Sequence, residues 1–185
     1  MPYSKKGIKF LGRLPQGAPT SPSLSNLVFE PIDIVMQNYA ENNRLTYTRY
    51  ADDICFSSAS TNFSRKMAME VVNFFDSTIR KHGYATKKVK TKIVPPGAPK
   101  IVLGLNVNHR SPKLTKAFKK RLEGHFRGMQ VFGIVEHAKH KNFNSAFGML
   151  DHFRGLINHA QLVERTYAEK WLGKFKNLVK SKRFD

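Results

Sequence analysis

The chain has 185 residues, of which 32 are Lys or Arg and 13 are Asp or Glu, and its formal net charge at pH 7 is +19. The length excludes a large multidomain machine, because one domain takes roughly 150 residues, and the charge favours a polyanionic partner, nucleic acid first of all. With 41% hydrophobic residues and 14 Phe, the composition excludes a disordered basic tail.

Residues 14–22, LPQGAPTSP, contain three prolines and a glycine, which predicts an extended loop rich in turns. A helix is expected from Ser23 onward, with Ser21 or Ser23 as its cap and a kink at Pro31. Apolar residues keep the helical period through this segment at Leu24, Leu27, Val28, Ile32, Val35, Met36 and Tyr39.

Two short β-prone runs, residues 45–49 and 54–57, flank the sequence YADD and predict a hairpin with its acids at the tip. A second helix is expected over residues 62–82, ended by Gly83. Strands around residues 86–94 and 100–107, joined by the turn PPGAP, are expected to form another hairpin.

Beyond residue 111 the apolar pattern becomes helical, and we expect helices near residues 116–126, 142–156 and 164–179. This change places a subdomain boundary near residue 111. The C-terminal part carries many Lys and Arg residues among these helices, a pattern typical of a clamp on nucleic-acid phosphates. From residue 109 onward, six histidines lack a nearby acid at metal-ligand spacing and are expected to be phosphate or surface contacts: His109, His125, His137, His140, His152 and His159.

No apolar run approaches the roughly 18–20 residues that a membrane span needs, and the start MPYSKKGIKF lacks the apolar stretch of a signal peptide. Cys55 is the only cysteine, and no Cys/His spacing resembles a zinc site. We therefore expect a cytoplasmic protein that has no membrane partner.

The adjacent acids Asp52 and Asp53 are unusual in a sheet, which favours β-branched and aromatic residues. They offer the hard anionic oxygens that Mg²⁺ prefers, and two metal ions can stabilise the attacking and leaving oxygens of a phosphoryl transfer. An isolated Asp-Asp pair is also typical of a solvated turn. The loop around Gly17 favours the functional interpretation, because a residue without a side chain lets a nucleotide or base pair approach the backbone.

Five segments resemble, in the right order, the conserved blocks of bacterial retron-type reverse transcriptases. Residues 14–28 (LPQGAPTSPSLSNLV) resemble the fourth block, and residues 47–57 (YTRYADDICFS) resemble the fifth, with its YADD box. Residues 83–94 (GYATKKVKTKIV) resemble the next block, and residues 102–108 (VLGLNVN) resemble the primer-grip hairpin. Residues 151–163 (DHFRGLINHAQLV) are similar to the thumb helices.

The resemblance implies an α+β fold, in which an antiparallel palm sheet with packed helices (residues 1–110) precedes an α-helical thumb (residues 111–185). It implies that Asp52 and Asp53 are catalytic and hold Mg²⁺. The residues expected at the nucleotide and template are Gln16, Gly17, Ala18, Pro19 and Lys90. Those expected to hold the primer are Tyr50, Leu103, Gly104 and Leu105.

In the family, the fingers and the palm strand with the first catalytic aspartate precede the fourth block, and this chain starts almost at that block. The remaining acids Glu30, Asp33, Glu41 and Asp76 are expected to be surface carboxylates. The chain alone is therefore not expected to polymerise. A separate polypeptide could supply the rest, or the chain could be an excised piece of a longer protein or a decayed, inactive fragment.

The favoured interpretation is one subunit of a split RNA-directed DNA polymerase of the bacterial cytoplasm. Its expected partners are a structured non-coding RNA, an RNA/DNA duplex, dNTPs and a second chain with the fingers and the remaining aspartate. The resemblance also suggests an effector protein and a role in defence against phage. The rivals are a catalytically inactive RNA-binding or scaffold protein and, less favoured, a group II intron-type maturase fragment.

Overall fold

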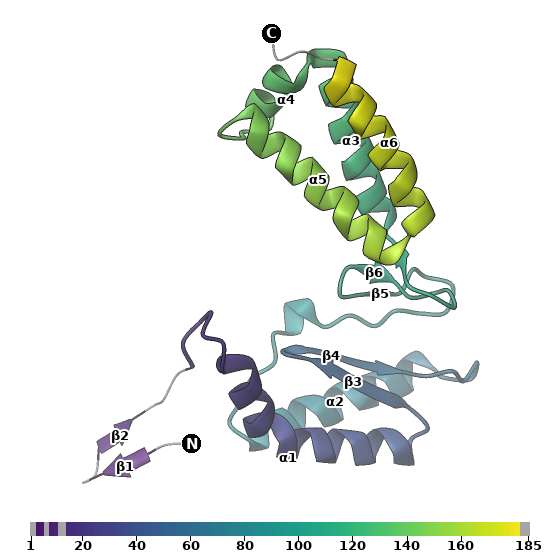
Figure 1. Cartoon of the computed structure of the whole chain (residues 1–185). Coiled ribbons are helices and arrows are strands. Elements are labelled where there is room, and N and C mark those ends of the chain that lie inside the picture. The colour runs from purple at the N-terminus through teal and green to yellow at the C-terminus, as the bar shows by residue number, and fades with distance from the viewer. Residues whose placement is uncertain (1–2, 6–7, 11–13, 182–185) are drawn as a thin grey trace. The chain divides into compact units, whose positions relative to one another are not determined.

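The computed structural model describes residues 3–5, 8–10 and 14–181. The chain divides into two compact units, residues 1–96 and 97–185 (Figure 1). Helices together with small antiparallel sheets agree with the expected α+β class. The assignment of a palm up to residue 110 and a thumb from residue 111 stays a prediction. No helix in the described residues is long and apolar enough to cross a membrane.

The first unit contains a two-stranded antiparallel sheet covered by two helices. In chain order it has β1 (Tyr3–Lys5), β2 (Ile8–Phe10), α1 (Ser21–Asn42), β3 (Thr46–Tyr50), β4 (Asp53–Ser57), α2 (Arg65–Lys81) and the short 3-10 helix η1 (Lys88–Lys90). Strand β1 pairs with β2, and β3 pairs with β4. Ile32 and Met36 of α1 and Ile79 of α2 form the core, packed against Tyr47 and Phe56 of the sheet.

The predicted cap of α1 is wrong. Thr20 precedes the helix without a side-chain capping bond, and the Ser21 hydroxyl instead donates to the carbonyl of Pro15 at 2.7 Å.

Pro31 lies inside a continuous helix, which bends along its length in Figure 1. The hairpin and the second helix are confirmed, and α2 begins after Ser64, whose hydroxyl accepts a hydrogen bond from the Met67 amide.

The predicted strand over residues 86–94 is wrong. The segment instead contains η1, and its Val89 side chain is 90% exposed. Four lysines between residues 87 and 92 leave few apolar side chains to bury, and a strand forms only where a neighbour pairs with its backbone. The predicted hairpin across the PPGAP turn is therefore wrong as well. Residues 100–107, expected to be one strand, themselves turn back at Leu103 and Gly104, and β5 (Ile101–Val102) pairs with β6 (Leu105–Asn106).

The second unit is a bundle of helices preceded by a small sheet. Strand β6 also pairs with β7 (Lys113–Leu114), and the helices are α3 (Lys116–Phe132), α4 (Ile134–His140), α5 (Ala146–Val163) and α6 (Arg165–Ser181). The three predicted helices are confirmed, while α4 was not predicted. The largest side chains of the core come from α3, α5 and α6: Leu122, Met129, Met149, Phe153, Ile157, Trp171 and Phe175.

The prediction that the histidines are surface or phosphate contacts is wrong for His137, which is 3% exposed. His125 Nδ1 lies 3.2 Å from His137 Nε2, and the ring centroids of His125 and His152 are 5.3 Å apart. Phe143 packs against both His125 and His152. Burial, followed by repulsion from His152 and His137, lowers the pKa of His125 to about 4.

This low pKa predicts that acid destabilises the second unit. Between about pH 6.5 and pH 4 the unfolded chain binds a proton at His125 that the folded chain does not, so the free energy of unfolding falls as pH falls through this window. Fluorescence of Trp171, the only tryptophan, would follow urea unfolding of this unit from pH 7.5 to 4. His125→Gln should show a flatter pH dependence, and parallel curves for the two proteins would contradict the assignment.

Two glycines of α3 offer a matched test of packing around the histidines. A Cβ atom on Gly128 would lie 2.2 Å from the His137 ring, whereas one on Gly124 would meet nothing within 4 Å. Gly128→Ala should therefore destabilise the second unit by about 1–3 kcal/mol. Gly124→Ala should stabilise it by up to about 1 kcal/mol, because alanine favours a helix. Urea unfolding followed by Trp171 fluorescence measures both, and equal effects would contradict this packing.

Candidate active site

The candidate site is the turn between β3 and β4. Tyr50 lies opposite Asp53 in the strand register, so Ala51 and Asp52 form a two-residue turn. The side chains of Asp52 and Asp53 are both exposed. Ala51 has φ +51°, a left-handed conformation that costs roughly 1–2 kcal/mol for a residue other than glycine. Other contacts must therefore hold this turn.

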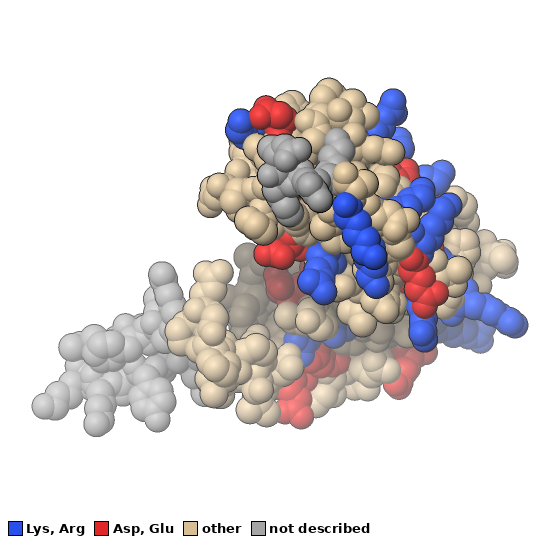
Figure 2. Space-filling view, turned by 45° about the horizontal axis from the view of Figure 1, so that its top comes forward, with Lys and Arg blue, Asp and Glu red and all other residues tan. Residues whose placement is uncertain are grey.

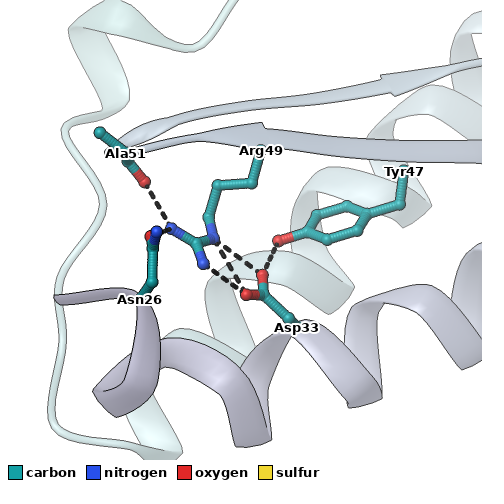
Figure 3. A network of polar contacts seen from close by, with 5 residues as sticks. All are labelled: Asn26, Asp33, Tyr47, Arg49 and Ala51. Carbon is teal, nitrogen blue, oxygen red and sulfur yellow. Dashed lines mark hydrogen bonds and ion pairs between the residues drawn. The ribbon is translucent and has the colours of Figure 1, made fainter. Parts of the chain in front are cut away.

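Arg49 provides those contacts (Figure 3). Its Nη1 donates to the carbonyl oxygen of Ala51 at 3.0 Å and to Asn26 Oδ1 of α1 at 2.9 Å. Its Nε donates to Asp33 Oδ1 at 2.8 Å, and its Nη2 donates to Asp33 Oδ2. The fork of the guanidinium thus joins the turn to α1 and fixes both groups.

Asp33 is the anionic centre of this network, so the prediction that it is a surface carboxylate is wrong. The hydroxyl of Tyr47 also donates to Asp33 Oδ1, at 2.6 Å. Burial tends to raise the pKa of Asp33, but the hydrogen bonds from Arg49 and Tyr47 outweigh it and leave the pKa lowered. Burial and the bond to Asp33 both raise the pKa of Tyr47. Asp33 is therefore an ionised structural anchor at neutral pH.

The other acids of this unit divide into two kinds. Asp76 is not a surface carboxylate as predicted, because its Oδ1 accepts a hydrogen bond from the Thr86 hydroxyl and its side chain is 17% exposed. Glu30 and Glu41 are exposed, as predicted.

In residues 14–181, no three His, Cys, Asp or Glu side chains are grouped so that they could hold a metal ion.

The loop with Gln16, Gly17, Ala18 and Pro19 leads directly into α1. Gly17 has φ +84°, and a Cβ atom there would meet nothing within 4 Å. The glycine is therefore favoured by its backbone conformation and leaves open space in front of the loop. Because α1 also carries the partners of Arg49, the loop and the hairpin share one supporting helix.

The remaining predicted residues lie away from the hairpin in the sequence. Lys90 is the last residue of η1 and is exposed. Leu103 and Gly104 form the two-residue turn between β5 and β6, with φ +49° and +79°, the signs that a type I′ turn requires. Leu105 follows in β6. Since residues 103–105 belong to the second unit, their contact with the primer stays a prediction.

The second unit carries most of the excess charge, with 18 Lys or Arg and 6 Asp or Glu in residues 97–185. Figure 2 shows Lys and Arg side chains gathered toward the right of the face in view, with Asp and Glu side chains between some of them. Some cations are engaged within the unit, since Lys119 pairs with Glu164 and Lys174 lies over the Trp171 ring at 4.5 Å. Lys139 and Arg165 also pair with Glu136 and Glu169, so only part of this positive charge is open to a polyanion.

Sequence reasoning missed Arg49 and Asp33. Tyr47 and Arg49 alternate with exposed residues along β3, so both face inward. A charged residue at an inward position of a strand was the signal that a partly buried ion pair would follow.

Comparison with known protein families shows which family the chain belongs to. The sequence model of the family described as "Reverse transcriptase (RNA-dependent DNA polymerase)" matches residues 3–131. The chain belongs to the reverse-transcriptase family. It is 31% identical over 166 residues to the retron Ec86 reverse transcriptase of Escherichia coli, a match that covers 88% of this chain and 50% of that relative.

Two further relatives are also retron enzymes. The retron Ec83 reverse transcriptase of E. coli is 27% identical over 83% of this chain and 46% of its own length. The retron Mx65 reverse transcriptase of Myxococcus xanthus is 32% identical over 50% of this chain and 21% of its own length. The chain thus spans at most about half the length of these curated relatives.

The Arg49 network predicts that Arg49→Lys loosens the hairpin of this reverse-transcriptase family member. Lysine keeps the charge but cannot bond to Asp33, Asn26 and the Ala51 carbonyl together, and lost bonds to a charged group cost about 1.5–3 kcal/mol. Amides of residues 46–57 should therefore exchange with deuterium roughly 10- to 150-fold faster.

The matched control is Arg80→Lys. The Arg80 side chain is 65% exposed and its Nη2 lies 4.0 Å from Asp76, so exchange in the hairpin should not change. Unaltered hairpin protection in Arg49→Lys would show that the network does not hold the turn.

Proposed function

We propose that this chain is part of an RNA-directed DNA polymerase of the retron type and works with the portion of the polymerase that its relatives have and it does not span. The observation that supports this most is the pair Asp52 and Asp53, exposed together at a tight turn that Arg49 holds against α1. This turn lies inside the segment that matches the reverse-transcriptase family.

The residues present fit Mg²⁺, because Asp52 and Asp53 offer adjacent, exposed carboxylate oxygens of the kind that this cation prefers. Magnesium, when bound, supplies stabilisation of the charge that develops on phosphate oxygens during nucleotidyl transfer. Within the chain, Asp52 and Asp53 hold the ion, and Arg49 positions the turn that carries them. A further carboxylate comes from the rest of the polymerase.

The substrates follow from the same assignment. Gln16, Gly17, Ala18 and Pro19, together with Lys90, contact the incoming dNTP and the template. Tyr50 and the turn at residues 103–105 contact the primer, and the basic helices of the second unit grip the RNA/DNA duplex, so binding weakens steeply as salt rises. Analogy with the retron family favours a structured non-coding RNA as template and the bacterial cytoplasm as location. A role in phage defence with an effector protein rests on family analogy.

A second function, a catalytically inactive RNA-binding protein, is favoured by one observation. The described residues bring together two candidate metal-binding carboxylates and no third. Both functions use the basic surface, and only the polymerase uses Asp52.

Asp52→Asn separates these two functions. In the complex purified from cells that express the complete native locus, the variant should lose at least about 100-fold in RNA-templated DNA synthesis, because several kcal/mol of charge stabilisation are removed. RNA affinity should stay within about twofold, since one exposed carboxylate contributes little to binding a polyanion.

The control is Asp151→Asn, an exposed aspartate on α5, which should leave synthesis unchanged. Equal synthesis by the Asp52 variant and the native protein, or RNA binding without any synthesis by the native complex, would favour the inactive RNA-binding protein.

A further inference from the structure

The segment that follows α2 carries Lys90 on a stretch of chain with little support of its own. From residue 81 to residue 92, Thr86 is the only residue that is not exposed. Four of the six residues from 87 to 92 are lysines. Like charges this close repel one another and favour an extended chain. Contacts with the rest of the first unit are therefore needed to hold η1 in one place.

The contacts that hold this segment lie before η1. The Tyr84 ring packs against that of Phe29 in α1, with the two centroids 5.9 Å apart. The Thr86 hydroxyl donates a hydrogen bond to Asp76 Oδ1 of α2. After η1, residues 92–96 make no hydrogen bond or ion pair within the part of the chain that the structure describes. The position of η1 thus depends on its N-terminal side.

Asp76 can serve as an anchor because α2 is itself fixed. Val71 and Ile79 of α2 are buried in the cores of the first unit. The Asp76 side chain is 17% exposed, and its Oδ2 lies 4.0 Å from Arg80, whose side chain is 65% exposed, so this ion pair contributes little. The Thr86 hydroxyl is therefore the principal partner of Asp76, and a hydrogen bond to a carboxylate is stronger than one between neutral groups.

Only Lys87 separates Thr86 from η1, and Lys90 is the last residue of η1. We propose that Asp76, through Thr86, positions η1 so that the ammonium group of Lys90 meets the phosphates of the incoming dNTP. Lys90 contacts the substrate, whereas Asp76 acts only through Thr86 and is a positioning residue. This inference rests on the proposed function, in which Lys90 contacts the dNTP.

Positioning matters for Lys90 because lysine is a point charge on a flexible stem. A charge that is already in place stabilises the charge that develops on phosphate oxygens without further reorganisation. The three neighbouring lysines carry the same charge, so an unanchored segment would bring different ammonium groups to the phosphates. The bond between Thr86 and Asp76 favours one of them, because it fixes where the 3-10 turn begins.

Steady-state kinetics test this role in the complex purified from cells that express the complete native locus. Asp76→Ala removes the acceptor and should lower kcat/KM for the dNTP about tenfold or more, because a displaced group at the reacting substrate is costly. Thr86→Val removes the donor and should cause the same loss. Asp76→Asn keeps an oxygen that accepts the Thr86 hydrogen bond, so kcat/KM should stay within about threefold of the native value.

A double-mutant cycle with Lys90→Ala separates positioning from a general structural role. If Asp76 acts through Lys90, Asp76→Ala should cost less than about twofold further in a protein that already carries Lys90→Ala. An equal loss in both backgrounds would show that Asp76 only supports the fold and would overturn the proposal. Native kcat/KM in Lys90→Ala, or in Asp76→Ala alone, would overturn it as well.

Amide exchange measures the order of η1 without DNA synthesis. The Lys90 amide donates to the Lys87 carbonyl at 2.8 Å, and the Thr91 amide donates to the Lys88 carbonyl at 3.0 Å. Asp76→Ala should speed deuterium exchange at both amides by about fivefold or more, because the turn loses its anchor. Unchanged exchange at these amides would overturn the proposal.

The matched control is Glu70→Ala. It removes an exposed acid from the same helix and should change neither kcat/KM nor exchange in η1. Effects equal to those of Asp76→Ala would show that the negative charge of α2, rather than the bond to Thr86, is responsible, and would overturn the proposal.

The two proposals fail in different ways. DNA synthesis that depends on Asp52, with equal losses from Asp76→Ala in both backgrounds, would leave the proposed function standing and overturn the positioning role. Absence of synthesis by the native complex, together with faster exchange at Lys90 in Asp76→Ala but not in Glu70→Ala, would overturn the proposed function and leave Asp76 standing as the residue that positions Lys90.

Discussion

The ion pair between Asp33 and Arg49 is the contact on which the geometry of the candidate site depends. Few local forces favour a left-handed alanine at the tip of an exposed hairpin, and the Arg49 bond to the Ala51 carbonyl opposes that strain. The Arg49 side chain is only 10% exposed, so its charge requires a partner, which Asp33 supplies. Removing Asp33 leaves the nearly buried charge of Arg49 unpaired, and removing Arg49 leaves the carboxylate of Asp33, which is 28% exposed, without its cation.

Helix α1 connects three features that are separate in the sequence. The loop with Gly17 leads into it, its middle carries Asp33, and its outer face exposes Leu27, Val28 and Ile34. The positions of the glycine loop and of the Asp52 turn therefore depend on the same helix.

The second unit separates its apolar core from its charge. Phe153, Met129 and Ile157 fill the interior, and most cations lie outside. The buried His137 ring lies against Gly128, and the partly buried His125 lies next to it, where burial lowers the pKa of His125 to about 4. The unit therefore keeps its positive charge at the surface, and the free energy of unfolding falls as pH falls from about 6.5 to 4.

The sequence by itself determined the hairpin with Asp52 and Asp53 at its tip, α2 with its ending, and three of the helices in the second unit, because turn chemistry and apolar periodicity act over a few residues. Tertiary structure decided the rest. Arg49 forms its ion pair with Asp33, 16 residues earlier in the sequence, and His137 is buried although no apolar pattern predicts it. Residues 86–94 form no strand although polar and apolar residues alternate in part of the segment. Each of these outcomes depends on which distant groups become neighbours, and that is a property of the packed chain rather than of any local segment.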